Sequence, residues 1–391
     1  MQIELDILQT LGIAIIAFSL GNLIKNKIEF FQKFFIPAPV IGGIIVSFIV
    51  FILKESGSYE IKFDDILQDF FMNIFFTCIG LTCSFKLLKK SGILGLKLAL
   101  AIIILLPLQN LIGVILSYFL KINPLYGIAM GSTSMTGGIG SAISFGKIME
   151  SFGASNSTEI GVAAATFGLL AGSLVGGPVA KRLIRKNNLK SLTSNNSLNE
   201  KISSLINQKT LLRAVVIIGL SAFLGTFVNK VLALTSLKFP YYVGCQFAGL
   251  IVRNIYDLGK KDIGIENIET LGNISLALFL SLALISLNIS AIVGIALPMI
   301  VIMLAQAAFI AIYTSLVTFN LTGKNYDAAV MVAGHCGVGL GQTPNAIANM
   351  DAIIVEEGPS EVAMFVFPIV LAIAVNLTNP IVITLFINIF K

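Results

Sequence analysis

Long apolar runs recur along this chain, and they limit its possible folds more than any other feature. The runs lie at about 7 to 24, 36 to 53, 66 to 85, 92 to 120, 159 to 180, 210 to 229, 239 to 252, 267 to 287, 291 to 319 and 361 to 389. A helix needs roughly 20 apolar residues to cross a hydrocarbon layer about 30 Å thick. Only 12% of the 391 residues are charged, whereas soluble domains carry about 25%. The sequence therefore predicts an all-α polytopic membrane protein with ten transmembrane helices.

The N-terminus, the cysteines and the charge pattern argue against several other classes. The first run follows MQIELD, which is acidic, and it lacks a small-residue cleavage site, so it is expected to be a retained span and not a signal peptide. The four cysteines (Cys78, Cys83, Cys245 and Cys336) lie in apolar surroundings without the close paired spacing of a metal site or a disulfide framework, which favours buried thiols. The net charge of +6 is not concentrated on one amphipathic face, so no nucleic-acid partner is expected.

Lys and Arg are unevenly divided between the two sides of the predicted membrane segments. If the acidic N-terminus is outside and the spans alternate, 19 of the 26 Lys and Arg residues fall on the other side. The positive-inside rule then places both termini outside and the polar connection at 181–209 in the cytoplasm. This orientation is expected for a multi-pass protein of the cytoplasmic, or inner, membrane.

The two halves of the chain resemble each other at an offset of 201 residues. The matched positions are Pro39 with Pro240, Gly43 with Gly244, Met130 with Met331, Gly138 with Gly339, and Gly140 with Gly341. The order of the spans is preserved, so the sequence predicts a first repeat at 1–180, a linker at 181–209 and a second repeat at 210–391. Because each half has five spans, the second repeat must have the inverted topology typical of secondary transporters.

Two glycine-rich segments separate the last two spans of each half. They are NPLYGIAMGSTSMTGGIGSAISFGKIMESFG (123–153) and KNYDAAVMVAGHCGVGLGQTPNAIANMDAIIVEEGPS (324–360). Each is too polar to span alone and too apolar for a solvated loop, so we expect re-entrant hairpins at about 125–147 and 325–349. Irregular backbone at membrane depth needs a protein-lined or water-filled cavity. Close helix packing through small residues is the alternative, but the proline and the alternating glycines of GHCGVGLGQTP are expected to interrupt a helix.

The hairpin tips supply the candidate binding residues. Half-helix N-termini suit a carboxylate, and backbone carbonyls with Ser, Thr and Asn oxygens suit sodium. The substrate-binding candidates are Ser134, Thr136, Gly137, Gly138, Gly140, Ser141, His335, Cys336, Gly337, Gly339, Gly341, Gln342, Thr343 and Asn345. The sodium candidates are Thr82, Ser286, Asn349 and the carbonyls of the tips.

Two roles stay open for His335. It could contact a substrate carboxylate or titrate with a coupling proton, or it could make a structural hydrogen bond that fixes the hairpin. An enzyme acting through His335 and Cys336 is disfavoured because the chain has no second histidine and no acidic partner near them. No catalytic residue and no cofactor other than a coupling ion is expected, and the absence of a GxxxxGK[ST] loop disfavours ATP as the energy source.

These residues resemble the sodium/glutamate symporter family. GHCGVGLGQTPNAIANM is similar to the second re-entrant motif of that family, and KNYDAAV, STEIGVAAATFGLLAGSLVGGPVA (157–180) and LGNISLALFLSLALISL (271–287) match as well. The resemblance implies a homodimer with ten spans and two oppositely oriented hairpins in each subunit. It also implies sodium as the coupling ion, L-glutamate as the substrate, and an elevator-like movement of a core domain against a dimerising scaffold.

The first hairpin departs from the family pattern. Members typically carry GGHGT there, whereas this chain has GGIGS, with Ile139 in the place of the histidine and Ser141 in that of the threonine. Gln342 and Asn345 also stand where other polar residues are usual. Glutamate is therefore the default substrate, and another amino acid or a small di- or tricarboxylate stays open.

Overall fold

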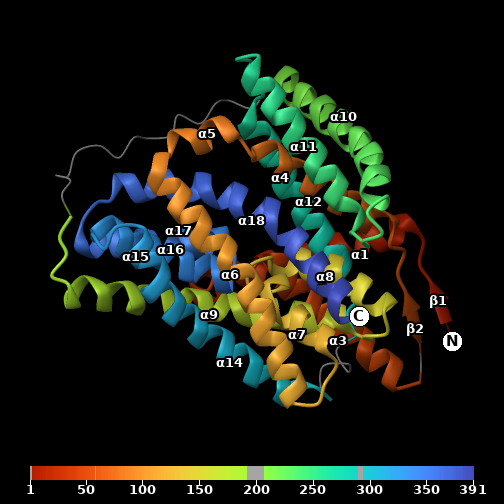
Figure 1. Cartoon of the computed structure of the whole chain (residues 1–391). Coiled ribbons are helices and arrows are strands. Elements are labelled where there is room, and N and C mark those ends of the chain that lie inside the picture. The colour runs from red at the N-terminus through yellow and green to blue at the C-terminus, as the bar shows by residue number, and fades with distance from the viewer. Residues whose placement is uncertain (1, 58, 192–206, 289–293) are drawn as a thin grey trace.

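Helices form almost all of the regular structure in this computed structural model, which describes residues 2–57, 59–191, 207–288 and 294–391 (Figure 1). The elements of the first half are β1 (Gln2–Glu4), α1 (Ile7–Lys27), α2 (Glu29–Lys33), α3 (Ala38–Glu55), β2 (Glu60–Lys62), α4 (Ile66–Thr82), α5 (Phe85–Lys90), α6 (Gly92–Phe119), α7 (Pro124–Ile128), the π-helical turn η1 (Ala129–Thr133), α8 (Gly138–Ser151) and α9 (Ser157–Lys186). The elements of the second half are α10 (Gln208–Ala233), α11 (Tyr241–Leu258), α12 (Ile265–Ile285), α14 (Ala296–Tyr313), the π-helical turn η2 (Thr314–Thr318), α15 (Phe319–Leu321), α16 (Tyr326–Leu340), α17 (Thr343–Glu357) and α18 (Glu361–Phe390).

The described residues contain nine helical segments that are long and apolar enough to cross a membrane. This confirms an all-helical integral membrane protein, but with one span fewer than predicted. The segment expected at 239–252 is helical as α11, yet Gln246, Arg253 and Asp257 make it less apolar than the other nine. The predicted start of the ninth span at 291 and most of the predicted linker at 181–209 lie outside the described residues, although α9 continues to Lys186.

A small parallel sheet joins β1 to β2, with Ile3 opposite Ile61. This sheet was not predicted, because two strands of three residues are too short to show a periodic pattern. The pairing holds the N-terminus beside the connection between α3 and α4.

The long helices form two bundles that share one interface. We call α1, α3, α4, α10, α11 and α12 bundle 1, and α6 to α9 with α14 to α18 bundle 2, because the extensive helix contacts occur within these sets. In Figure 1 bundle 1 lies on the right, and α18 crosses the middle of the molecule. The bundles meet where α8 contacts α12 and where α4 contacts α18.

Small residues allow the helices of bundle 1 to approach closely. A Cβ atom on Gly42 of α3 would lie 1.7 Å from the carbonyl oxygen of Ala17 in α1, so no larger residue fits at this crossing. Such packing is the usual source of helix association where lipid removes the hydrophobic driving force. The four cysteines are buried and free, as predicted.

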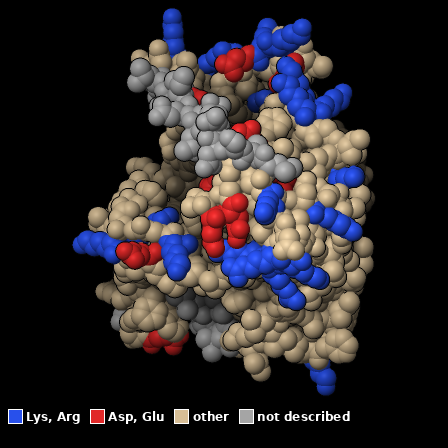
Figure 2. Space-filling view, turned by 90° about the vertical axis from the view of Figure 1, so that its left-hand side faces the viewer, with Lys and Arg blue, Asp and Glu red and all other residues tan. Residues whose placement is uncertain are grey.

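One end of the molecule gathers many charged side chains. Figure 2 looks onto this end, where α9 and α17 finish, and shows Lys and Arg spread across it with Asp and Glu among them. There, Lys181 of α9 forms an ion pair with Glu356 of α17. At the end of the molecule near the N-terminus, Lys147 of α8 pairs with Asp69 of α4 at 3.0 Å.

Candidate functional site

Two pairs of short helices lie in the segments where re-entrant hairpins were predicted. We call α7, η1 and α8 helix pair 1 (residues 124–151) and α16 with α17 helix pair 2 (residues 326–357). Each pair begins at an asparagine cap: the side-chain oxygen of Asn123 accepts from Leu125 N at 2.9 Å, and that of Asn325 accepts from Ala328 N at 2.9 Å. Asparagine satisfies the free N–H groups of a first helical turn in this way.

Helix pair 1 is broken over residues 131–138. Gly131 leaves helical geometry at φ −88° and ψ −139°, and Gly138 has a φ of +67°. Glycine takes that left-handed conformation without steric cost, whereas other L-residues do not. The hydroxyl group of Ser134 donates to the carbonyl oxygens of Ala129 and Gly161, the latter at 2.7 Å, and so ties the break to α9.

Helix pair 2 is broken only at Gly341 and Gln342. The predicted interruption within GHCGVGLGQTP is confirmed, but Gly337 and Gly339 take no part in it, because α16 continues through them to Leu340. Those two glycines serve close packing instead. A Cβ atom on Gly337 would lie 2.7 Å from the backbone of Ala346, and one on Gly339 would lie 2.6 Å from the side chain of Ile310.

A cavity of about 870 Å³ lies between the two breaks and bundle 1. Its lining from the helix pairs comprises Thr136, Gly137, Gly140, Ser141, Val338, Gln342, Thr343, Pro344, Ile347, Ala348 and Asp351. The other lining residues are Phe35, Phe75, Phe76, Ile79, Gln246, Asn273, Leu276, Leu371, Val375, Asn376, Asn379 and Pro380. The lining that comes from helix pair 2 follows α17 from Thr343 to Asp351, so the cavity runs from the breaks toward the end of the molecule drawn in Figure 2.

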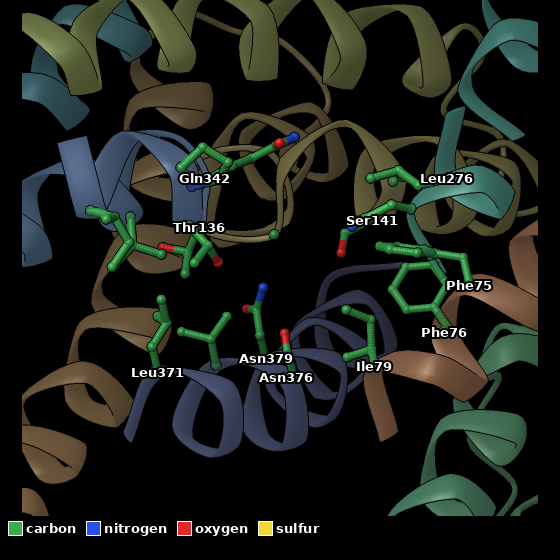
Figure 3. Close-up of a pocket in the computed structure, with 18 of the residues that line it drawn as sticks. Phe75, Phe76, Ile79, Thr136, Ser141, Leu276, Gln342, Leu371, Asn376 and Asn379 are labelled. Carbon is green, nitrogen blue, oxygen red and sulfur yellow. The ribbon is translucent and has the colours of Figure 1, made fainter. Parts of the chain in front are cut away.

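Polar groups of both helix pairs and of α18 converge on the cavity. In Figure 3, Asn376 and Asn379 project from α18 toward Thr136 and Ser141 of helix pair 1, while Gln342 of helix pair 2 lies on the far side and Phe75 and Phe76 flank them. The amide group of Asn379 donates to the carbonyl oxygen of Ser132 at 3.0 Å. A Cβ atom on Gly138 would lie 2.9 Å from Nε2 of Gln342, so the two breaks touch.

Both second helices of the pairs begin at this cavity. α8 starts after Gly137 and α17 starts after Gln342, and neither residue makes a side-chain cap hydrogen bond. The first-turn N–H groups of a helix carry a partial positive charge. Among the described residues that line the cavity, Asp351 is the one with a charged side chain. The cavity can thus attract an anion by backbone dipoles without any basic side chain.

The candidate substrate-binding residues divide into two groups. Thr136, Gly137, Gly140, Ser141, Gln342 and Thr343 line the cavity. Ser134, Gly138, His335, Cys336, Gly337, Gly339, Gly341 and Asn345 lie in or beside the helix pairs without lining it. In this second group, the amide group of Asn345 donates to Leu169 O and to Ser173 Oγ, both at 2.8 Å, which fastens helix pair 2 to α9.

His335 and Cys336 are fully buried in α16. Nδ1 of His335 is 2.8 Å from the hydroxyl group of Thr318, and Sγ of Cys336 is 3.1 Å from that of Thr314. Of the two roles left open for His335, this geometry matches the structural hydrogen bond.

The three sodium candidates also lie outside the cavity lining. Thr82 donates to Ile79 O at 2.7 Å and Ser286 donates to Ala283 O at 3.0 Å, so each hydroxyl group bonds to its own chain one turn back. The amide group of Asn349 donates to Gly172 O at 2.8 Å and to Ala333 O at 3.3 Å. Within the described residues, no cluster of three His, Cys, Asp or Glu side chains could hold a metal ion.

Several lining residues were absent from the candidate set. Gln246 of α11, Asn273 of α12 and Asn376 of α18 are polar residues inside apolar runs. Intramembrane polar residues are a signal of function, and that signal could have identified them. Phe75 and Phe76 carry no such signal, because aromatic residues are common in any apolar span.

α9 supports helix pair 2 through a glycine that can be tested directly. A Cβ atom on Gly168 would lie 2.1 Å from the carbonyl oxygen of Leu340, whereas one on Gly177 of the same helix would meet nothing within 4 Å. We expect Gly168→Ala to lower the free energy of unfolding by about 1 to 3 kcal/mol, as overpacking usually does. Thermal unfolding in detergent measures this. Gly177→Ala is the matched control and should not destabilise; equal effects would refute the close contact.

Comparison with known proteins assigns the chain to a family. The family model described as Sodium/glutamate symporter matches residues 3–359. The sodium/glutamate symporter of Escherichia coli (strain K12) is 38% identical over 396 residues and covers 98% of each chain, and that of Haemophilus influenzae is 34% identical over 381 residues, or 95% of this chain and 94% of the relative. A solved sodium proton antiporter from Methanocaldococcus jannaschii, aligned over 98% of this chain and 96% of that one, gives a TM-score of 0.42 at 14% identity, which is too low to support an inference. On the strength of the family model and these relatives, the chain belongs to the sodium/glutamate symporter family.

Proposed function

We propose that this chain is a sodium-driven symporter that carries L-glutamate across the cytoplasmic membrane. Family membership supports this proposal, and the single structural observation that carries it is the cavity where two uncapped helix N-termini meet. Glutamate has two carboxylates and one ammonium group. The N-terminal ends of α8 and α17 can each attract a carboxylate, and the side chains of Thr136, Ser141, Asn376 and Asn379 can hydrogen-bond to the substrate.

Sodium would bind at the breaks of the helix pairs. The cation prefers oxygen ligands, and this part of the chain supplies them. The hydroxyl groups of Ser132 and Thr133 and Oδ1 of Asn379 are buried without a hydrogen-bond partner among the described residues. Together with the carbonyls of the breaks, they fit a sodium ion better than Thr82, Ser286 or Asn349, whose side chains already bond to backbone carbonyls.

The proposed architecture is two inverted repeats of five spans with oppositely oriented re-entrant hairpins. Corresponding elements support it. α3 and α11 are both 18 residues long, α9 and α18 are both 30, and both helix pairs begin at an asparagine cap. On this proposal the repeats occupy 1–180 and 210–391, with α11 as the tenth span.

Transport would follow an elevator mechanism in a homodimer. Bundle 2 contains both helix pairs and would be the moving core, and bundle 1 would be the scaffold that holds the dimer together. The cavity lies at the interface between the bundles, which is where a core-bound substrate would be released. The proposed orientation has both termini outside and the charged end of the molecule drawn in Figure 2 in the cytoplasm. The cavity then runs from the breaks toward the cytoplasmic side.

Uptake by reconstituted protein tests this function. In proteoliposomes with an inward sodium gradient, we expect accumulation of labelled glutamate, and we expect no accumulation when potassium replaces sodium or when an ionophore removes the gradient. Unlabelled aspartate, citrate and other small acids should compete weakly. Uptake that ignores sodium would refute the coupling, and stronger competition by another acid would reassign the substrate.

A further inference from the structure

Helix α6 inserts a glutamine between the two helix pairs. Gln109 is fully buried and lies two residues after Pro107, which stands inside α6. Its Nε2 donates to the carbonyl oxygen of Gly339 in helix pair 2 at 2.7 Å, and its Oε1 accepts from the hydroxyl group of Thr136 in helix pair 1 at 2.6 Å. One carboxamide group therefore bonds to both pairs.

One of its partners lies at a break and the other lies two residues before the second break. Thr136 lines the cavity, and Gly339 lies in the last turn of α16, where carbonyl groups have no partner within the helix. The next residue of α6 acts on the same region, since Oδ1 of Asn110 accepts from Ser132 N at 2.8 Å. These bonds replace backbone hydrogen bonds that the breaks remove.

The position of Gln109 is itself fixed from a neighbouring helix. Nε2 of Gln306 in α14 donates to the backbone oxygen of Gln109 at 2.7 Å, and the hydroxyl group of Tyr313 donates to Ala101 O of α6 at 2.7 Å. Hydrogen bonds from α14 thus hold α6 in place. The carboxamide group of Gln109 can rotate by 180° only if both of its bonds to the helix pairs break.

We propose that Gln109 is a positioning residue that couples the two breaks, so that glutamate and sodium bind cooperatively. A ligand that orders one break on binding would also order the other break, because both helix pairs bond to the carboxamide group of Gln109. The second ligand then loses less conformational entropy when it binds. The proposal rests on the proposed function, and it adds a coupling element outside the cavity lining.

Substitutions at Gln109 test the coupling in proteoliposomes. In Gln109→Leu we expect the KM for glutamate to rise about tenfold, the change that loss of one or two buried hydrogen bonds produces, and to depend less on the sodium concentration than in the native protein. Gln109→Glu should show the native KM only at pH values low enough to protonate the introduced carboxyl group, because a carboxyl group can donate to Gly339 O and accept from Thr136 only when it is protonated. Gln68→Leu, the same change at a buried glutamine of α4, is the matched control and should retain the native KM and its dependence on sodium.

Hydrogen–deuterium exchange gives a readout that needs no substrate. Gln109→Leu should speed exchange at both breaks, 131–138 and 341–342, while Gln68→Leu should change neither. Faster exchange at one break only, a glutamate KM that depends on sodium as in the native protein, or a Gln109→Glu variant whose KM does not change with pH would each overturn the coupling. Absence of sodium-driven uptake by the native protein would instead refute the proposed function, so the two failures are distinguishable.

Discussion

A Gly138→Val variant is expected to lose sodium-driven glutamate uptake almost completely while still inserting into the membrane. Gly138 holds a φ of +67° at the break of helix pair 1, and a Cβ atom there would lie 2.9 Å from Nε2 of Gln342 at the break of helix pair 2. The left-handed backbone costs a non-glycine residue about 1 to 2 kcal/mol, and a β-branched side chain must also push Gln342 away. Both changes act where the two breaks touch, so they should displace the N-terminal ends of α8 and α17. Uptake in proteoliposomes measures the effect.

Gly92→Val separates backbone strain from this contact. Gly92 has a φ of +61°, close to that of Gly138, but a Cβ atom there would meet nothing within 4 Å. The control variant is expected to lose about as much stability from the backbone, yet to keep substantial uptake. Equal loss of uptake in the two variants would show that strain alone is responsible and would remove the Gly138 contact from the mechanism.

The two bundles make a hydrogen-bonded contact at α18. Pro380 has no N–H group, so the carbonyl oxygen of Asn376, four residues earlier, has no helical partner. Nε2 of Gln246 in α11 donates to that oxygen at 2.7 Å. Gln246→Leu leaves the carbonyl group unpaired and should lower the free energy of unfolding by about 1 to 3 kcal/mol.

Restoring the helical donor should rescue this loss. Pro380→Ala supplies the missing N–H group, and its stabilising effect is expected to be larger by about 1 kcal/mol in the Gln246→Leu background than in the native protein. Thermal unfolding in detergent completes the double-mutant cycle. Pro368→Ala, in the same helix, should give the same change in both backgrounds, and additive effects for Pro380→Ala would exclude the proposed pairing.

This pairing also bears on the proposed elevator. Gln246 belongs to bundle 1 and Asn376 to bundle 2, and both line the cavity. A movement of one bundle past the other must break the bond, so variants that remove it should change how the protein is distributed between its inward-facing and outward-facing states. Pro380 therefore has a physical role beyond a bend in the helix: it exposes an acceptor at the interface.

The apolar runs allowed the helices to be located from the sequence, because spanning a membrane requires about 20 apolar residues whatever they pack against. Nine of the ten predicted spans are long and apolar enough in the described residues to cross a membrane. The remaining one, α11, differs because Gln246 and Arg253 make it less apolar. The family resemblance stated from the motifs is confirmed.

The glycine-rich segments and the interruptions within them were located correctly, but the glycines that make the second interruption were not identified. The alternation of Gly337, Gly339 and Gly341 suggested an interrupted helix, yet only Gly341 interrupts it. Glycine permits both an unusual backbone conformation and close packing, and sequence cannot distinguish these roles. The distinction depends on Ala346 and Ile310, which lie against the other two glycines and come from other helices.

The sequence by itself determined the helical membrane class, the family and the two segments that hold the breaks, since these follow from local composition and motifs. Only the tertiary structure decided which residues face the cavity. His335 and Thr136 are both polar residues of the glycine-rich segments. His335 is buried against Thr318, whereas Thr136 lines the cavity and bonds to Gln109. The reason is physical: a polar side chain in a membrane protein must find a partner, and whether that partner is another helix or a bound substrate depends on contacts between segments far apart in the chain.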